Sequence, residues 1–70
     1  ADLELYRRAY LDLKSRYEQV KKIYWKARRA KDIEAKEEAL REVQSLDRQL
    51  KDLENQVKEQ NNGLLPQWWK

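Results

Sequence analysis

This chain of 70 residues contains neither cysteine nor histidine. The lack of cysteine excludes disulfides, thiol nucleophiles and thiolate ligands, and the lack of histidine removes the commonest metal ligand and general base. Glycine and proline occur once each, and 41% of the residues are charged. A composition so poor in helix-breaking residues and so rich in charge is typical of long helices and coiled coils.

Long apolar runs are also missing from the sequence. No stretch approaches the roughly 18 apolar residues of a membrane-spanning helix. Residues 1–4, Ala-Asp-Leu-Glu, have neither the charged nor the apolar region of a signal peptide. The sequence therefore predicts that the chain is either soluble or an excised piece, and it leaves the compartment open. Membranes rank last among the expected partners.

No pattern in the sequence indicates catalysis. Glu37 with Glu38 and Glu42 with Asp47 come closest to an acid and base pair, but their surroundings are too polar to form a catalytic cleft. Neither a glycine-rich phosphate loop nor a metal-ligand spacing occurs. We therefore predict a non-enzymatic protein without a cofactor.

Apolar residues recur at alternating steps of three and four along both halves of the chain, the spacing that keeps one stripe of a helix facing a partner. The first stripe consists of Leu3, Tyr6, Tyr10, Leu13, Tyr17, Val20, Tyr24 and Ala27. The second stripe consists of Ala39, Val43, Leu46, Leu50, Leu53 and Val57. The heptad phase changes between the two stripes, which predicts a turn or a stutter there.

We predict an all-α fold in which residues 1–62 form an antiparallel, coiled-coil-like hairpin of two helices. Helix one is expected at about residues 2–30, the turn at about 31–32 and helix two at about 33–62, with Asp32 placed to cap the second helix. The alternative is one long helix in a parallel coiled-coil dimer. In such a dimer three tyrosines would face their own copies at positions that prefer isoleucine or valine.

The hairpin hypothesis also predicts which residues meet across the seam, because the numbers of two facing residues should sum to about 63. The expected pairs are Tyr6 with Val57, Tyr10 with Leu53, Leu13 with Leu50, Tyr17 with Leu46, Val20 with Val43 and Tyr24 with Ala39. On one flanking edge, Arg7 should approach Glu54 and Lys14 should approach Asp47. Both pairs are attractive.

The two halves of the chain carry opposite charge. Residues 1–31 hold ten Lys and Arg against four Asp and Glu, a net charge of +6. Residues 32–62 hold five against nine, a net charge of −4. Opposite halves of this kind attract each other when the chain folds back on itself.

A single seam between two helices leaves little margin of stability, since ordering each residue costs about 1 to 2 kcal/mol. We therefore expect the hairpin to self-associate into a four-helix bundle or to bind a protein partner. A second, discontinuous apolar surface outside the seam would be buried in this way. This surface consists of Leu5, Leu11, Ile23, Trp25 and Ile33.

Residues 63–70 are predicted to form a non-helical, apolar tail that contains two tryptophans. The Asn-Asn-Gly sequence at 61–63 is typical of a helix terminus, and Pro66 prevents the helix from restarting. Three placements are open to the tail. In order of preference, it packs back onto the open end of the hairpin, docks in the groove of a partner, or inserts at a membrane interface.

The first placement would bring the tail onto Leu3, Leu5 and Tyr6, whereas the second would make its tryptophans an anchor in a partner protein. The residues that we assign to partner binding are Leu64, Leu65, Trp68, Trp69 and Trp25.

The strongest signal for nucleic acid lies in residues 21–31, where six cations surround Trp25. Lys and Arg neutralise phosphates and release counterions, and a tryptophan stacks on an unpaired base. The candidate residues for nucleic acid or an acidic partner are Arg8, Lys21, Lys22, Lys26, Arg28 and Arg29. Pairing with an acidic second helix explains the same cations, and the whole chain carries a net charge of only +3.

These observations predict a protein–protein interaction or assembly module with a Trp-rich tail as its anchor. The expected partner is another protein, a second copy of the chain, or both. Binding of nucleic acid through the basic face of helix one is the alternative hypothesis.

Overall fold

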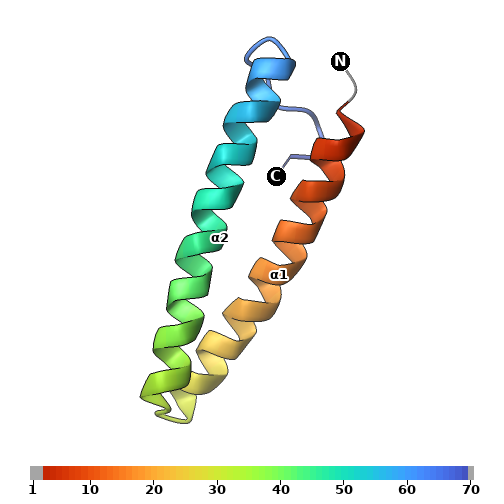
Figure 1. Cartoon of the computed structure of the whole chain (residues 1–70). Coiled ribbons are helices and arrows are strands. Elements are labelled where there is room, and N and C mark those ends of the chain that lie inside the picture. The colour runs from red at the N-terminus through yellow and green to blue at the C-terminus, as the bar shows by residue number, and fades with distance from the viewer. Residues whose placement is uncertain (1–2, 70) are drawn as a thin grey trace.

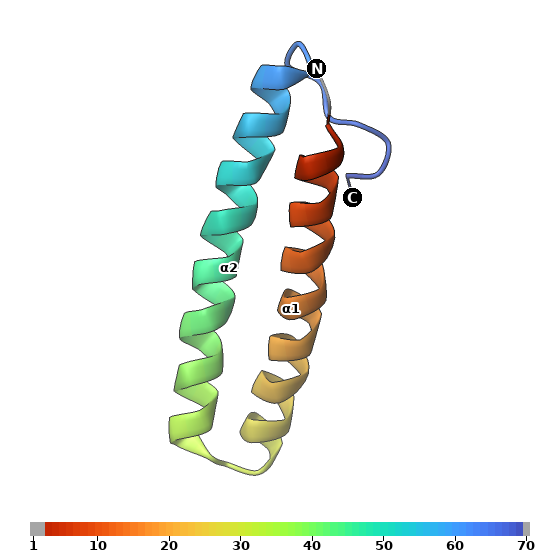
Figure 2. The same cartoon turned by 45° about the vertical axis from the view of Figure 1, so that its right-hand side comes forward.

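The computed structural model describes residues 3–69 as an antiparallel hairpin of two helices (Figure 1). Helix α1 spans Glu4–Arg29, and helix α2 spans Ile33–Gln60. The two helices lie side by side in both views (Figures 1 and 2), and the molecule measures 46 by 15 by 15 Å. The all-α hairpin is thus confirmed, and the alternative of one long helix does not hold. Neither described helix has the length and apolar character that crossing a membrane requires.

The seam between α1 and α2 contains the apolar stripes that the heptad spacing indicates. One hydrophobic cluster is centred on Tyr10, Leu53 and Val57, and a second on Val20, Ala39 and Leu46. Both members of each of the six expected pairs lie in the same cluster. The largest fully buried side chains are Val20 and Val57, one in each cluster. The register inferred from the sequence therefore describes the packed seam.

A short turn at residues 30–32 connects the two helices. The amide of Asp32 donates to the carbonyl of Ala27 at 2.9 Å, and the amide of Lys31 donates to the carbonyl of Arg28 at 3.2 Å. Lys31 has a φ of 58°, the left-handed conformation that commonly ends a helix. The carboxylate of Asp32 then accepts a hydrogen bond from the amide of Ala35 at 3.2 Å, which satisfies a free donor in the first turn of α2.

Helix α2 ends in a second left-handed turn. Asn62 and Gly63 have φ values of 56° and 80°, and the amide of Gly63 donates to the carbonyl of Lys58 at 2.7 Å. The side chain of Asn61 donates to the carbonyl of Leu64 at 3.0 Å. These bonds satisfy carbonyls at the helix end and turn the tail back toward α1, as Figure 2 shows.

The charged edges of the seam differ from the expectation. Arg7 pairs with Glu4 within α1 at 3.8 Å, and Glu54 pairs with Lys51 and Lys58 within α2 at 3.3 and 3.9 Å. The expected pair of Arg7 with Glu54 is therefore wrong. Neighbours three and four residues apart on one helix already lie within reach, so each of these charges has a local competitor for the partner across the seam.

Lys14 also departs from its expected pairing with Asp47. Its Nζ lies 6.0 Å from the ring centroid of Tyr10 and 5.8 Å from that of Tyr17. The tyrosine rings of the seam thus attract a cation that the sequence analysis assigned to a carboxylate.

Candidate functional site

The residues singled out from the sequence lie in two separate regions of the hairpin. The tail residues lie at the open end, where α1 begins and α2 ends (Figure 1). Trp25 and most of the basic residues lie on α1 toward the turn. The structure does not bring the two groups together, so they are described in turn.

At the open end, the tail packs on the hairpin of its own chain. The ring of Tyr10 lies 5.5 Å from the ring of Trp68 and 4.4 Å from that of Trp69, centroid to centroid. Both tryptophans are partly buried, and Tyr10 is only 4% exposed. The amide of Trp69 donates to the carbonyl of Pro66 at 3.1 Å, which folds the tail into a tight turn. Three aromatic rings therefore close the seam at this end.

The tail covers less of α1 than the fold-back placement predicted. Tyr6 belongs to the same cluster as the tryptophans, but Leu5 is 73% exposed. Leu64 and Leu65 also face solvent. Leu5 lies on the outer side of α1, away from the stripe that Tyr6 and Tyr10 share, so a tail centred on Tyr10 leaves it uncovered.

Toward the turn, large apolar residues stay outside the seam. Trp25 is 48% exposed and Ile33 is 65% exposed, and Leu40 is exposed as well. The guanidinium of Arg28 lies 5.1 Å from the ring centroid of Trp25, and Arg28 and Ile33 line one pocket, so these residues share one side of the hairpin. Leu40 follows Ile33 by one heptad and lies on the same side. We call Trp25, Ile33 and Leu40 the Trp25 face.

The opposite side of the hairpin carries the ion pair that crosses the seam. The guanidinium of Arg16 donates two hydrogen bonds to the carboxylate of Glu42, one of them from Nη2 to Oε1 at 3.0 Å. This hydrogen bond and the positive charge of Arg16 hold the pKa of Glu42 below its ordinary value, and the same bond raises the pKa of Arg16. Both side chains are exposed, so water screens the pair.

Sequence reasoning missed the pair of Arg16 with Glu42, although the register contained the signal. Arg16 immediately precedes the seam residue Tyr17, and Glu42 immediately precedes the seam residue Val43. In an antiparallel pair of helices, positions that precede the seam residues meet on one edge. The expected pairs of Arg7 with Glu54 and Lys14 with Asp47 lie on the other edge, where positions follow the seam residues.

The candidate basic residues form an exposed surface on α1 rather than a set of ion pairs with α2. Among residues 3–69, Arg16 is the one cation of α1 that forms an ion pair across the seam. The Nζ of Lys21 lies 5.5 Å from the ring centroid of Tyr17, and the guanidinium of Arg28 lies over the ring of Trp25. The exposed candidates are Arg8, Lys21, Lys22, Lys26, Arg28 and Arg29.

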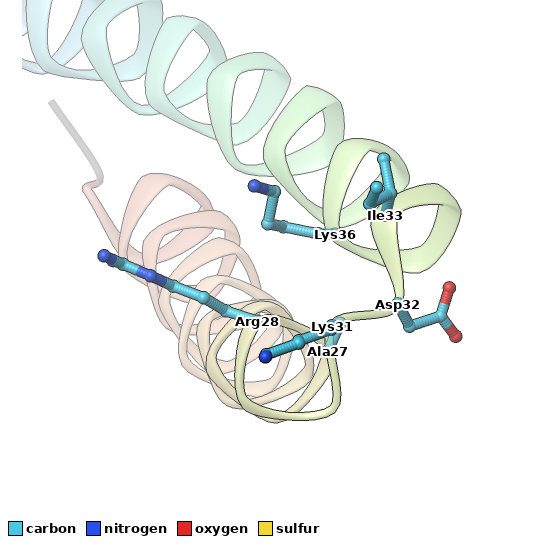
Figure 3. Close-up of a pocket in the computed structure, with 6 residues that line it drawn as sticks. All are labelled: Ala27, Arg28, Lys31, Asp32, Ile33 and Lys36. Carbon is cyan, nitrogen blue, oxygen red and sulfur yellow. The ribbon is translucent and has the colours of Figure 1, made fainter.

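A pocket of about 290 Å³ lies at the turn on the side of the Trp25 face. Its lining residues are Ala27, Arg28, Lys31, Asp32, Ile33 and Lys36, drawn in Figure 3. We call it the turn pocket. A smaller hollow of about 180 Å³ lies on the other side of the turn, lined in part by Ile23, Ala30 and Ala35.

The fold and these surfaces define an antiparallel helical hairpin with an aromatic tail packed on its open end. A scan of protein-family models, a search of curated proteins and a search of solved structures each found no match to this chain.

Proposed function

We propose that this protein is a non-enzymatic assembly module, in which two copies of the hairpin pack through their Trp25 faces into a four-helix bundle. The observation that carries the proposal is the exposure of large apolar side chains on one side of the hairpin near its turn, namely Trp25, Ile33 and Leu40. A soluble protein rarely leaves apolar side chains gathered in this way without a partner. Packing two hairpins would remove them from water.

The distribution of charge favours a second copy of the chain as the occupant of this face. Helix α1 holds nine Lys and Arg against three Asp and Glu, whereas α2 holds five against eight. A twofold axis parallel to the helices would place α1 of each copy over α2 of the other. The two helices that face each other would then carry opposite net charges, which supports this arrangement over one that stacks α1 on α1.

The same axis also matches the apolar residues to each other. It keeps both turns at the same end, so Trp25 of one copy lies level with the segment between Ile33 and Leu40 of the other. An aromatic side chain would therefore enter a site lined by two aliphatic ones, and the interface would be the same from both sides. Aromatic anchors of this kind supply much of the binding energy at protein interfaces.

The tail would contribute to assembly at the open end. Leu64 and Leu65 are exposed, whereas Trp68 and Trp69 are held against Tyr10. We propose that the tryptophans fix the tail on the hairpin and that the two leucines are available to a partner. Partner binding through the tryptophans themselves would require the tail to leave Tyr10.

The test compares two substitutions at residues of equal exposure on opposite sides of α1. Trp25 and Ile23 are each 48% exposed, and Ile23 lies by the smaller hollow on the other side. Trp25→Glu should raise the dissociation constant of the dimer at least about tenfold in sedimentation equilibrium, because it places a charge in the apolar interface. Ile23→Glu should leave the dissociation constant unchanged. A wild-type chain that stays monomeric at millimolar concentration, or equal effects of the two variants, would contradict the proposal.

A second candidate function is binding of nucleic acid through the basic face of α1. The observation in its favour is that the exposed cations Arg8, Lys22, Lys26 and Arg29 form no ion pair within residues 3–69. They are therefore available to phosphates. Affinity for a single-stranded oligonucleotide should fall steeply with rising salt if several phosphates are neutralised. Negligible affinity at low salt rejects this function.

A further inference from the structure

The turn pocket combines a concave shape with a high density of positive charge. Arg28 lies in the last turn of α1, Lys31 lies in the turn and Lys36 lies in the first turns of α2, and all three line the pocket. Their side chains extend to the same side of the turn in Figure 3. Ala27, which is buried, and Ile33 are the apolar residues of the lining. At about 290 Å³, the volume lies near the lower end of the range of small-molecule sites.

The negative charge nearest to these cations is directed away from them. Asp32 is the one acidic residue that lines the pocket, and its carboxylate points to the opposite side of the turn in Figure 3. That carboxylate accepts the hydrogen bond from the amide of Ala35 that caps α2. Within the described part of the chain, none of the three cations forms an ion pair. Three positive charges therefore surround the pocket without a carboxylate to neutralise them.

The backbone of Lys31 adds an independent observation. Its φ of 58° is a conformation in which a helix end normally carries glycine or asparagine. A residue with a side chain is less stable there than in a right-handed conformation, because its Cβ crowds the following carbonyl oxygen. Glycine would make the same turn without this cost, so the turn does not require a lysine. The lysine does supply the pocket with one of its three cations.

We propose that the turn pocket binds a small anionic ligand with two linked phosphate groups. The guanidinium of Arg28 donates paired hydrogen bonds in the geometry that phosphate oxygens accept, and the two ammonium groups neutralise the remaining charge. Ala27 and Ile33 would contact the apolar part of such a ligand. Two phosphates carry more charge than one carboxylate and match three cations better. The site is complete in one chain, and because Ile33 belongs to both the turn pocket and the Trp25 face, ligand binding and the proposed dimer would compete for this surface.

The ordinary explanation of cations at the end of α1 is the helix dipole, which favours positive charge in the last turn. That explanation covers Arg28 but not Lys36, which lies near the start of α2 where the dipole favours negative charge. Lys36 is also partly buried rather than extended into solvent. The dipole alone therefore does not account for the set of three.

The test is a titration of the full chain with inorganic pyrophosphate at low ionic strength, followed by the NMR shifts of the backbone amides. Saturable shifts are expected at residues 27–36 and not elsewhere along the helices. Lys31→Asn should weaken the affinity roughly tenfold, because it removes one charge-assisted contact while asparagine keeps the left-handed turn. Lys22→Gln is the matched control, since it removes one exposed charge of α1 that does not line the pocket.

Equal loss of affinity in Lys31→Asn and Lys22→Gln would overturn the proposal, because it would mean that pyrophosphate responds only to the net charge. Shifts that grow linearly without saturation would overturn it as well. Vesicles of phosphatidylcholine with and without diacylglycerol pyrophosphate, a lipid that carries two linked phosphates, test the other source of the same group. Sedimentation with diacylglycerol pyrophosphate that Lys31→Asn abolishes and Lys22→Gln preserves assigns the pocket to a lipid headgroup. Binding of pyrophosphate without sedimentation assigns it to a free ligand.

Discussion

The two ends of the hairpin differ in how their apolar seam residues are covered. At the open end, the aromatic seam residue Tyr10 packs against Trp68 and Trp69 of the tail, so three segments of chain share one hydrophobic cluster. At the turn end, the seam closes with the small buried residue Ala27 on α1, and only the two helices contribute to it.

 Ala39 is the small residue that faces this part of α1. The large apolar side chains nearby, Trp25 among them, stay outside the seam and exposed.

This difference shows that the heptad stripe alone does not decide how much apolar surface a hairpin buries. The small seam residues near the turn bury little area, whereas the ring of Tyr10 at the open end is covered by a third segment of the chain. The tail supplies that segment at the open end, whereas a second copy of the chain would supply it at the turn end.

The largest effect is expected from Tyr10→Ala, which removes the ring that joins α1, α2 and the tail. Loss of a buried aromatic side chain typically costs about 3–5 kcal/mol of the free energy of unfolding. A single core of this size rarely supplies more than about 3–5 kcal/mol in total, so the variant should be largely unfolded. Urea denaturation followed by far-ultraviolet circular dichroism measures the change. Leu5→Ala, at an exposed position of α1, should shift the free energy of unfolding by less than about 0.5 kcal/mol.

The next effect concerns the tail itself. Replacing Trp68 and Trp69 together by alanine should lower the free energy of unfolding by about 2 kcal/mol, since two partly buried rings leave Tyr10. Trp25→Ala should change the stability of the dilute, monomeric chain by less than about 0.5 kcal/mol, because its ring lies outside the seam. The comparison is made by urea denaturation at low chain concentration. Equal losses at the two sites would show that the open end and the turn end do not differ as described.

A smaller effect is expected at the cap of α2. Asp32→Ala removes the acceptor for the amide of Ala35 and should cost about 1 kcal/mol of the free energy of unfolding. Asp32→Asn keeps an acceptor oxygen at the same position and should retain most of that stability. Thermal denaturation of both variants tests the role of the cap, and similar losses in the two would assign the effect to charge instead.

The smallest effect is the pH dependence of the pair of Arg16 with Glu42. The pKa of Glu42 is lower in the folded chain than in the unfolded chain, where it lies near its ordinary value. Its contribution to stability is therefore fully present above that ordinary value and is lost as the pH falls through the lowered folded pKa. Glu42→Gln removes this contribution. The difference in stability between wild type and variant, measured by urea denaturation from pH 7 to pH 3, should shrink toward the acid end, and a constant difference would exclude the pair as its source.

Much of the seam could be predicted because it depends on local spacing. Steps of three and four place Tyr10 and Val20 on one stripe of α1, and the phase change locates the turn within a few residues. The pairing across the seam then needs only one number, the sum of facing positions. The expected pair of Arg7 with Glu54 did not follow from the same register, because each of these residues has a partner on its own helix.

The candidate sites depended more strongly on three-dimensional contacts. Composition identified Trp25 and the basic residues, but not that Arg28, Lys31 and Lys36 line one pocket while Asp32 turns away. Residues from α1, the turn and α2 meet there only after the chain reverses, and the direction of Lys31 depends on its left-handed backbone. Neither property is periodic, so no spacing in the sequence predicts it.

The sequence by itself determined two helices, the position of the turn and the stripe that each helix buries, because backbone hydrogen bonding and apolar periodicity act over a few neighbouring residues. Only the tertiary structure decided that the tail tryptophans pack on Tyr10, that Arg16 crosses the seam to Glu42, and that three cations surround the turn pocket. These contacts join residues far apart along the chain. Each is a competition among several partners of similar strength, and the geometry of the packed hairpin decides which partner is within reach.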